Sequence, residues 1–234
     1  MTVLNVAMFG CDELAKEIAK ATDQRDVHTY VHKETKDGVA KIISIIRPAR
    51  YPERLRPLLN AISAGRVGII EINAIDAVLG EVLVAFASSS IEHGIAVVKP
   101  KEGDWVDQEM AEKMFAQAGL TKWKFMAPDG LEIRNKLYDM MNDIEDELAN
   151  SATSPLVISI DQHFNVKGIG LVAIGYVQCG TLRVHDELHI LPSNGGGNTK
   201  SLQVMDDDVQ SAQSGDRVGI AIRGAKDDSL SNGS

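Results

Sequence analysis

One stretch decides the fold of the C-terminal part of this chain: Val157-Ile158-Ser159-Ile160-Asp161-Gln162-His163-Phe164-Asn165-Val166-Lys167-Gly168-Ile169-Gly170. Apolar residues alternate along it and a Gly-x-Gly turn follows, which is typical of a strand that leads into a hairpin. Short alternating runs separated by glycines continue at 170–177, 187–191, 200–205 and 217–222. No helical periodicity interrupts them. Residues 155–234 are therefore predicted to form a small antiparallel β-barrel.

The residues before this barrel show a different pattern of secondary structure. Up to about residue 150, short β-branched runs alternate with helical patterns, and a Ser-rich stretch at 150–155 reads as a linker. Strands are expected at 4–9, 27–32, 39–46, 67–72, 95–99 and 123–126, and helices at 12–21, 52–64, 76–88, 107–118 and 131–148. Strands and helices in this alternation predict a mostly parallel sheet covered on both faces. Residues 1–150 are thus expected to form a Rossmann-like, three-layer α/β domain.

Composition excludes several classes of protein. The net charge is −9, of which residues 151–234 contribute −3 (6 Lys+Arg against 9 Asp+Glu), so neither part resembles the basic stripe of a general nucleic-acid binder. No apolar run is long enough to span a bilayer, and the N-terminus lacks the pattern of a secretory signal. Cys11 and Cys179 lie far apart and have no metal-ligand spacing. We expect a cytoplasmic protein without a metal site or a membrane partner.

Three segments carry a resemblance to a known family. The stretch at 157–170 resembles the start of the second domain of elongation factor Tu and its relatives, and the run at 176–188 resembles the hairpin that follows it there. The run Ser214-Gly215-Asp216-Arg217-Val218-Gly219-Ile220-Ala221-Ile222-Arg223-Gly224 is similar to the family's A-G-D-x-V-G-x-x-[LI]-R-G. The chain is therefore identified as a degenerate archaeal-type member of the elongation factor Tu and selenocysteine-specific elongation factor group. The resemblance implies a P-loop-GTPase-like domain and an intact second-domain barrel, with the third domain absent or truncated.

The family's phosphate loop reads G-x-x-x-x-G-K-[ST], and this chain has Gly10-Cys11-Asp12-Glu13-Leu14-Ala15-Lys16-Glu17 in its place. Gly10, Lys16 and the spacing remain, but Ala15 replaces the second glycine and Glu17 replaces the hydroxyl that would hold Mg²⁺. The acids at 12 and 13 lie where a polyphosphate would bring negative charge. We expect a loop of the original length that its own acids cap. A small anion held by Gly10 and Lys16 stays open as an alternative.

The other nucleotide motifs of the family are missing as well. The D-x-x-G position reads Ile46-Arg47-Pro48-Ala49-Arg50, and Lys99-Pro100-Lys101-Glu102 stands where N-K-x-D is expected. The interval between the first helix and Val27 leaves no room for a long switch loop. We therefore expect no catalytic residue, no cofactor and no enzymatic activity. The alternative is a GTP-binding elongation factor with divergent motifs, for which GTP and Mg²⁺ would be the cofactors.

The resemblance also implies partner contacts in the barrel, and the family positions carry over to Asp161, Gln162, Phe164, Ile174 and Arg223. Ile174 replaces the threonine of aminoacyl-tRNA carriers, which argues against that activity. What remains is a non-catalytic binding module for RNA, tRNA, the ribosome or another translation factor. The first domain would then serve as a scaffold or as the dimerisation surface of a homo-oligomer.

A second alternative is a binder of small anionic ligands. Arg47, Arg50, Asn73 and Lys99 each follow a predicted strand. Ligands of open α/β sheets bind outside the carboxyl ends of the strands. The four side chains are therefore predicted to form a basic pocket at that edge.

Overall fold

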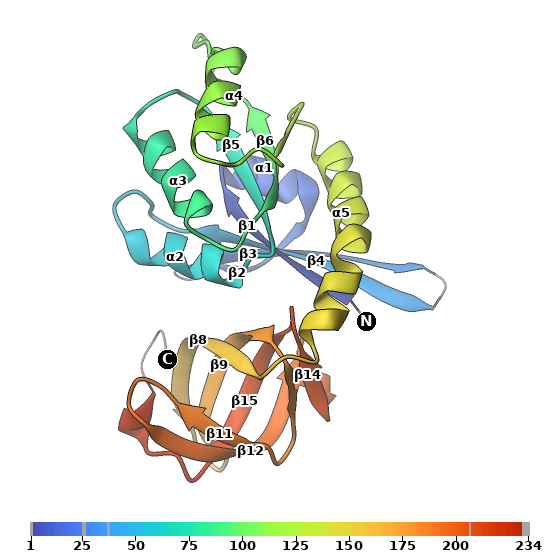
Figure 1. The fold of residues 1–234 in the computed structure, drawn as a ribbon, viewed down its shortest axis with the longest axis vertical. Coiled ribbons are helices and arrows are strands. Elements are labelled where there is room, and N and C mark those ends of the chain that lie inside the picture. Colours follow the sequence, from blue (N-terminus) through green and yellow to red (C-terminus); the bar gives the residue numbers. More distant parts are fainter. Residues whose placement is uncertain (1, 25–26, 37, 206, 231–234) are drawn as a thin grey trace. The chain divides into compact units, whose positions relative to one another are not determined.

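The computed structural model describes residues 2–24, 27–36, 38–205 and 207–230. The chain divides into two compact units, unit 1 (Met1–Asp143) and unit 2 (Ile144–Ser234). No helix in the described part of the chain is long and apolar enough to cross a membrane. Figure 1 colours the chain from blue at its N-terminus to red at its C-terminus.

Unit 1 is built on a seven-stranded mixed sheet with the strand order β2-β3-β4-β1-β5-β6-β7. Strands β4, β1, β5, β6 and β7 are parallel, and β2 and β3 form an antiparallel edge. The strands are β1 (Thr2–Phe9), β2 (Lys20–Gln24), β3 (Val27–Lys36), β4 (Val39–Pro48), β5 (Val67–Ile72), β6 (His93–Val98) and β7 (Lys124–Met126). The helices are α1 (Asp12–Ile18), α2 (Leu55–Ala64), α3 (Ala77–Ala87), α4 (Gln108–Gln117) and α5 (Gly130–Ser151).

Helices cover both faces of this sheet. Figure 1 shows α2 and α3 on one side of the strands and α5 on the other. Leu58, Phe86 and Phe115 bring α2, α3 and α4 into one apolar cluster with the central strands. The indole of Trp123 lies directly on Gly68 and Gly94, where an added Cβ would come within 2.3 Å and 2.5 Å of the ring. Burial of apolar side chains in this cluster stabilises unit 1.

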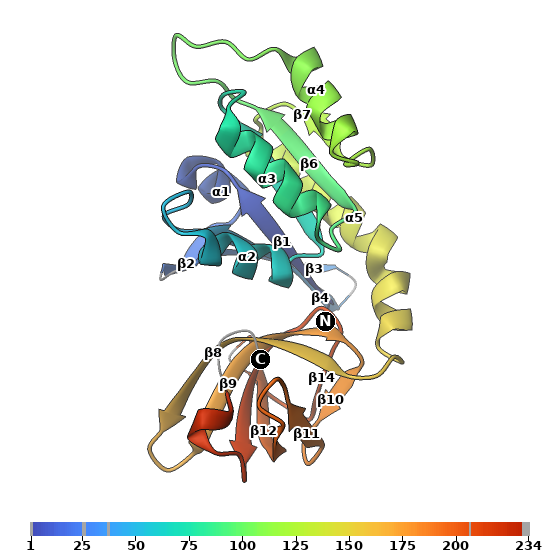
Figure 2. The same cartoon turned by 60° about the vertical axis from the view of Figure 1, so that its left-hand side comes forward.

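Two predicted helices are clearly longer than those of the structure. The helix expected at 52–64 begins only at Leu55. The helix expected at 12–21 ends at Ile18, because Ala19 is already extended and the Arg134 side chain donates to the carbonyl oxygens of Glu17 and Ile18, at 2.7 and 2.5 Å. The chain then forms β2, which pairs with β3 (Figure 2). Residues 20–24, which follow the first helix, therefore form an edge strand.

Unit 2 confirms the predicted antiparallel barrel, although the sheet closes only in part. Its main sheet has the order β11-β12-β15-β9-β8, with β13 beside β12, and a two-stranded sheet pairs β10 with β14. The strands are β8 (Val157–Val166), β9 (Gly170–Cys179), β10 (Thr181–Arg183), β11 (Glu187–Ile190), β12 (Gly195–Val204), β13 (Asp207–Val209), β14 (Ser211–Gln213) and β15 (Arg217–Arg223), followed by the 3₁₀ helix η1 (Asp227–Ser229). Alternate residues of β9, β12 and β15 fill the apolar interior of this half-barrel.

Candidate functional site

The segment from Gly10 to Glu17 does not form the expected loop. Only Gly10 and Cys11 separate β1 from α1, which starts at Asp12 and has seven residues. Lys16 therefore lies in the last turn of the helix, and Ala15 is fully buried beneath it. A loop of the original length is not formed, because the helix predicted at 12–21 does begin at Asp12. The Cys11 sulfur accepts a hydrogen bond from the Leu14 N–H at 3.3 Å, and two acids fill the first turn.

The backbone amide at this turn is occupied by a carboxylate of the protein itself. Glu71, near the end of β5, is only 2% exposed, and its Oε2 accepts a hydrogen bond from the Cys11 N–H. The Cys11 thiol donates to Glu71 Oε1 at 3.3 Å. A Cβ on Gly10 would lie 2.8 Å from Glu71 Oε2, so this close approach requires glycine.

The Cys11 thiol in this arrangement is a donor and not a nucleophile. Burial raises its pKa to about 11, with a further contribution from the neighbouring Glu71 carboxylate. The thiol is therefore protonated at neutral pH, which suits its hydrogen bond to Glu71.

A second set of polar contacts surrounds Asp12. Its carboxylate accepts from the buried Tyr30 hydroxyl and forms an ion pair with Lys16 at 2.5 Å. The hydrogen bond from Lys16, followed by that from Tyr30, lowers the Asp12 pKa. Lys16 thus neutralises an acid of its own helix. In the alternative hypothesis Gly10 and Lys16 hold a small anion. In the structure, however, Gly10 packs against Glu71 and Lys16 is paired with Asp12.

Of the four residues predicted to form an anion pocket, Arg50, Asn73 and Lys99 follow strands of unit 1, whereas Arg47 lies within β4. Arg47, on β4, donates to the Gly10 carbonyl oxygen at 2.7 Å and contacts His28 Nδ1 at 3.3 Å. Arg50 follows β4 with φ of 58°, and Asn73 and Lys99 directly follow β5 and β6. Arg47 therefore acts as a structural tie between β4 and the β1–α1 turn, while a pocket shared by all four stays a prediction.

The five barrel residues carried over from the family lie in one region of the sheet of unit 2. Asp161 is the extra residue of a β-bulge in β8, between Ile160, which pairs with Gly175, and Gln162, which pairs with Ile174. Phe164, two residues further along β8, is 42% exposed. Arg223 is exposed at the end of β15, directly after Ile222, which pairs with Leu171 of β9. The adjacent strands β8, β9 and β15 thus carry all five positions.

Comparison with known proteins accounts for both units. Residues 170–234 match the model of elongation factor Tu domain 2. Over its full length the chain is 32% identical to the uncharacterized protein MJ0325 of Methanocaldococcus jannaschii, of which it spans 71%. It is also 35% identical, over 44% of its own length, to the selenocysteine-specific elongation factor of that organism. The chain belongs to the elongation factor Tu and selenocysteine-specific elongation factor family.

Solved structures of this translation-factor family share the fold. A bacterial selenocysteine-specific elongation factor superimposes with a TM-score of 0.73 at 19% identity, over 99% of this chain. The elongation factor SelB of Methanococcus maripaludis, in complex with the GTP analogue GppNHp, superimposes with a TM-score of 0.71 at 20% identity. This family member spans 44% and 54% of those two chains, and 21% of the selenocysteine-specific factor of M. jannaschii.

Sequence reasoning missed Glu71 as part of the site. The strand Val67–Ile72 is buried at every position, so an ionisable residue within it requires a buried partner. That rule marks Glu71 as a residue with a specific partner. It does not reveal that the partner is the Cys11 amide, because the pairing depends on how β5 lies beside β1.

Proposed function

We propose that this family member is a non-catalytic binding module of translation-factor type. Its α/β unit would bind no guanine nucleotide, and its half-barrel would contact RNA, the ribosome or another translation factor in the cytoplasm. One observation carries the first part: helix α1 and the Glu71 carboxylate occupy the place where a phosphate loop would hold an anion. Family membership supports the second part.

Geometry and charge together support the proposal that no nucleotide binds. A phosphate loop binds polyphosphate through several backbone N–H groups that point at one centre and through a lysine at the β- and γ-phosphates. Here Leu14 N–H is bonded to the Cys11 sulfur and Cys11 N–H to Glu71. A polyphosphate would have to displace one carboxylate, approach Asp12 and Glu13, and break the Lys16 ion pair. Each of these steps costs free energy.

The decisive test of the first part is titration of fluorescent GDP and GTP analogues with Mg²⁺. The selenocysteine-specific factor of M. jannaschii is the matched control from the family. We expect no saturable binding to this chain at concentrations that saturate the control. Micromolar or tighter affinity would overturn the proposal and favour a GTPase with divergent motifs.

The second part is tested by co-sedimentation with archaeal ribosomes. Phe164→Ala and Arg223→Ala are expected to lower the bound fraction several-fold, because both side chains are exposed on the strands that carry the family's contact positions. Val157→Ala is the matched control, since Val157 is an exposed apolar residue of the same strand β8. Equal binding by all four proteins would argue against a contact at β8, β9 and β15.

A further inference from the structure

Helix α5 contacts the rest of unit 1 through two stripes of side chains that run along the helix at four-residue spacing. The first stripe is apolar and fully buried, and it consists of Ile133, Leu137 and Met141. The second stripe is polar and lies one position further along, and it consists of Arg134, Tyr138 and Asn142. Each polar side chain bonds to a different element: Arg134 to α1, Tyr138 to β3 and Asn142 to β4. The polar stripe therefore holds α5 to three elements of unit 1.

The contact in the middle of the polar stripe contains a titratable group, the imidazole of His32. The Tyr138 hydroxyl oxygen lies 2.8 Å from His32 Nδ1 and 3.4 Å from the His32 carbonyl oxygen. The same hydroxyl oxygen accepts a hydrogen bond from the backbone N–H of Glu34. A hydroxyl has one proton, which it donates to the nearer acceptor, so His32 Nδ1 carries no proton here. The neutral imidazole with its proton on Nε2 is therefore the form that fits Tyr138.

Protonation of His32 reverses the direction of this hydrogen bond. An imidazolium donates from both ring nitrogens, so Nδ1 would donate to the Tyr138 oxygen. The hydroxyl proton would then have to turn to the His32 carbonyl oxygen, which lies at 3.4 Å, near the limit of a hydrogen bond. Protonation thus leaves the Tyr138 hydroxyl with a poor acceptor.

The surroundings of His32 also disfavour a positive charge. Burial lowers the pKa of His32 below its ordinary value of 6.5, and the Arg134 guanidinium lowers it further, whereas Glu34 raises it. The Arg134 side chain is held in place, because it donates to the two carbonyl oxygens at the end of α1. Protonation of His32 therefore adds a second positive charge near a guanidinium that is already fixed.

The other charged side chains on the elements around this site do not offset the repulsion. They are Lys20 of β2, Lys33 of β3, Lys41 of β4, Glu17 of α1, and Lys136 and Asp139 of α5. The two on α5 form an ion pair at 3.9 Å, and Lys41 donates to Asn142. Glu17 is exposed, and Lys20 lies opposite Val31, the residue before His32. In the described part of the chain, Glu34 is thus the carboxylate whose charge favours the cation.

We propose that His32 and Tyr138 form a pH-dependent latch, in which protonation of His32 loosens residues 134–142 of α5 while the sheet of unit 1 stays folded. The latch stabilises this segment fully above pH 6.5, the ordinary pKa of histidine, and the stabilisation is lost as pH falls through the lower pKa of the folded state. Because α5 continues into residues 144–151 of unit 2, the latch sets how firmly the helix that joins the two units is held in unit 1. Neither nucleotide nor RNA takes part in it, so the latch stands apart from the proposed function.

Amide hydrogen exchange of the whole chain, followed by NMR at about pH 7.5 and about pH 5, tests the latch. Each rate is expressed as a protection factor, which removes the intrinsic pH dependence of exchange. We expect the protection factors of residues 134–142 to fall about fivefold or more at the lower pH, as the weakening of one hydrogen bond implies. The protection factors of β6 are expected to stay unchanged.

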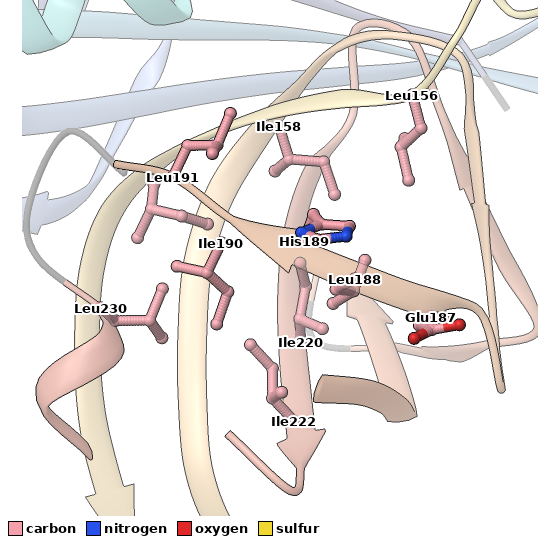
Figure 3. Close-up of a pocket in the computed structure, with 11 residues that line it drawn as sticks. Leu156, Ile158, Glu187, Leu188, His189, Ile190, Leu191, Ile220, Ile222 and Leu230 are labelled. Atoms are coloured by element: carbon pink, nitrogen blue, oxygen red, sulfur yellow. The ribbon is translucent and has the colours of Figure 1, made fainter. Parts of the chain in front are cut away.

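His32→Gln separates the latch from other effects of pH. Glutamine can accept a hydrogen bond from Tyr138 but does not titrate, so residues 134–142 are expected to keep the same protection at both pH values. Two controls remove a histidine elsewhere and are expected to retain the wild-type fall. His93→Gln changes β6, which is separated from β3 by β4, β1 and β5 in the sheet. His189→Gln changes an exposed residue of β11 in unit 2 (Figure 3).

Tyr138→Phe provides an independent measurement. Without the hydroxyl, the neutral imidazole loses the hydrogen bond that favours it over the cation. The pKa of His32, measured from the resonances of its ring, is therefore expected to rise relative to that of the wild type. A purely structural role of Tyr138 would destabilise α5 without raising this pKa.

Three results of the exchange experiment would overturn the proposal. The first is a wild-type α5 whose protection does not change with pH, and the second is a fall that persists in His32→Gln or disappears in either control. The third is an equal fall at β6, which would mean that unit 1 unfolds as a whole. If His32→Gln does not fold, the pKa of His32 in Tyr138→Phe decides, and an unchanged or lower pKa defeats the latch.

Discussion

The two units retain the family's motif residues to different extents. In unit 2 the glycines stand where the backbone needs them: Gly168, Gly170, Gly180 and Gly215 all have positive φ, in turns that the sequence pattern predicts. In unit 1 the segment Gly10–Glu17 keeps only the spacing of a phosphate loop, and its backbone is a helix. A preserved spacing therefore says little about local structure unless the residues that impose the unusual backbone are preserved too.

The cause of this difference lies in the residues between the two ends of the segment. Leu14, Ala15 and Ile18 supply a buried face at helical spacing, and the acids at the first turn favour the positive end of the helix. With alanine in place of the second glycine, nothing in the segment favours a loop over this helix. The barrel turns at Gly168, Gly180 and Gly215 have no comparable alternative, because each contains a glycine with a positive φ that other residues adopt at a cost.

The largest effect is expected from a substitution beneath Trp123. Gly94→Val places side-chain atoms inside the indole ring, which is held between Phe86 and Phe115 with ring centroids at 5.3 and 5.6 Å. We expect unit 1 to lose about 3 kcal/mol or more of unfolding free energy. Urea unfolding followed by tryptophan fluorescence measures it. GTP with Mg²⁺ is expected to restore none of the lost unfolding free energy. If GTP did restore stability, unit 1 would bind nucleotide and would not differ from unit 2 in having lost its family function.

Gly80→Ala is the control within unit 1. Gly80 lies in α3, and an added Cβ meets no atom within 4 Å. Alanine is favoured over glycine in a helix by roughly 1 kcal/mol, so this variant is expected to be slightly more stable than the wild type. A loss of stability comparable to that of Gly94→Val would show that unit 1 tolerates no change at glycine, whatever the packing.

The second effect tests the glycines of unit 2. Gly180 has φ of 81°, and its added Cβ would lie 2.5 Å from Leu156 Cα. Gly180→Ala is expected to cost about 2 kcal/mol, combining backbone strain with a collision that no flexible side chain can relieve. Gly168→Ala shares the positive φ but has open space, so about 1 kcal/mol is expected. The unfolding free energy is measured on the transition of unit 2 by circular dichroism. Equal losses for the two variants would show that close packing at Gly180 adds nothing to the cost of backbone strain.

These glycines also illustrate which features of the fold can be predicted from the sequence. The barrel was predictable, because turn glycines and alternation are local signals. The antiparallel edge strand β2 was not, because its formation depends on Arg134, more than a hundred positions further along the chain, capping α1. Likewise the sequence placed Arg47 at the correct edge of the sheet, but its hydrogen bond to Gly10 follows from the order β4-β1-β5. Local patterns thus specify elements and faces, whereas the tertiary arrangement assigns partners.

The third effect separates structure from ligand binding at Glu71. Glu71→Ala leaves the Cys11 N–H without its acceptor and is expected to cost unit 1 about 2 kcal/mol. Glu71→Gln keeps an acceptor oxygen and is expected to cost about half as much. Both variants are expected to bind GDP as poorly as the wild type, since α1 stays helical. Nucleotide binding gained by Glu71→Gln would mean that the Glu71 carboxylate alone had excluded the nucleotide. Unit 1 would then retain most of the family's site, as unit 2 retains the family's barrel.

The smallest effect concerns a half-buried carboxylate of unit 2, that of Asp216. Asp216 accepts from the Gln213 N–H at 2.8 Å, and burial raises its pKa above the ordinary value of 3.8. Because the pKa is higher in the folded state, the stability contributed by this group is complete below pH 3.8 and is lost as pH rises through the folded pKa. Asp216→Asn keeps an acceptor and carries no charge. The variant is therefore expected to gain on the wild type between pH 3 and pH 7, by about 1 kcal/mol or less in urea unfolding of unit 2. If the stability of the variant instead falls relative to the wild type over this pH range, the ionised carboxylate is favourably bound, as at Asp12 in unit 1.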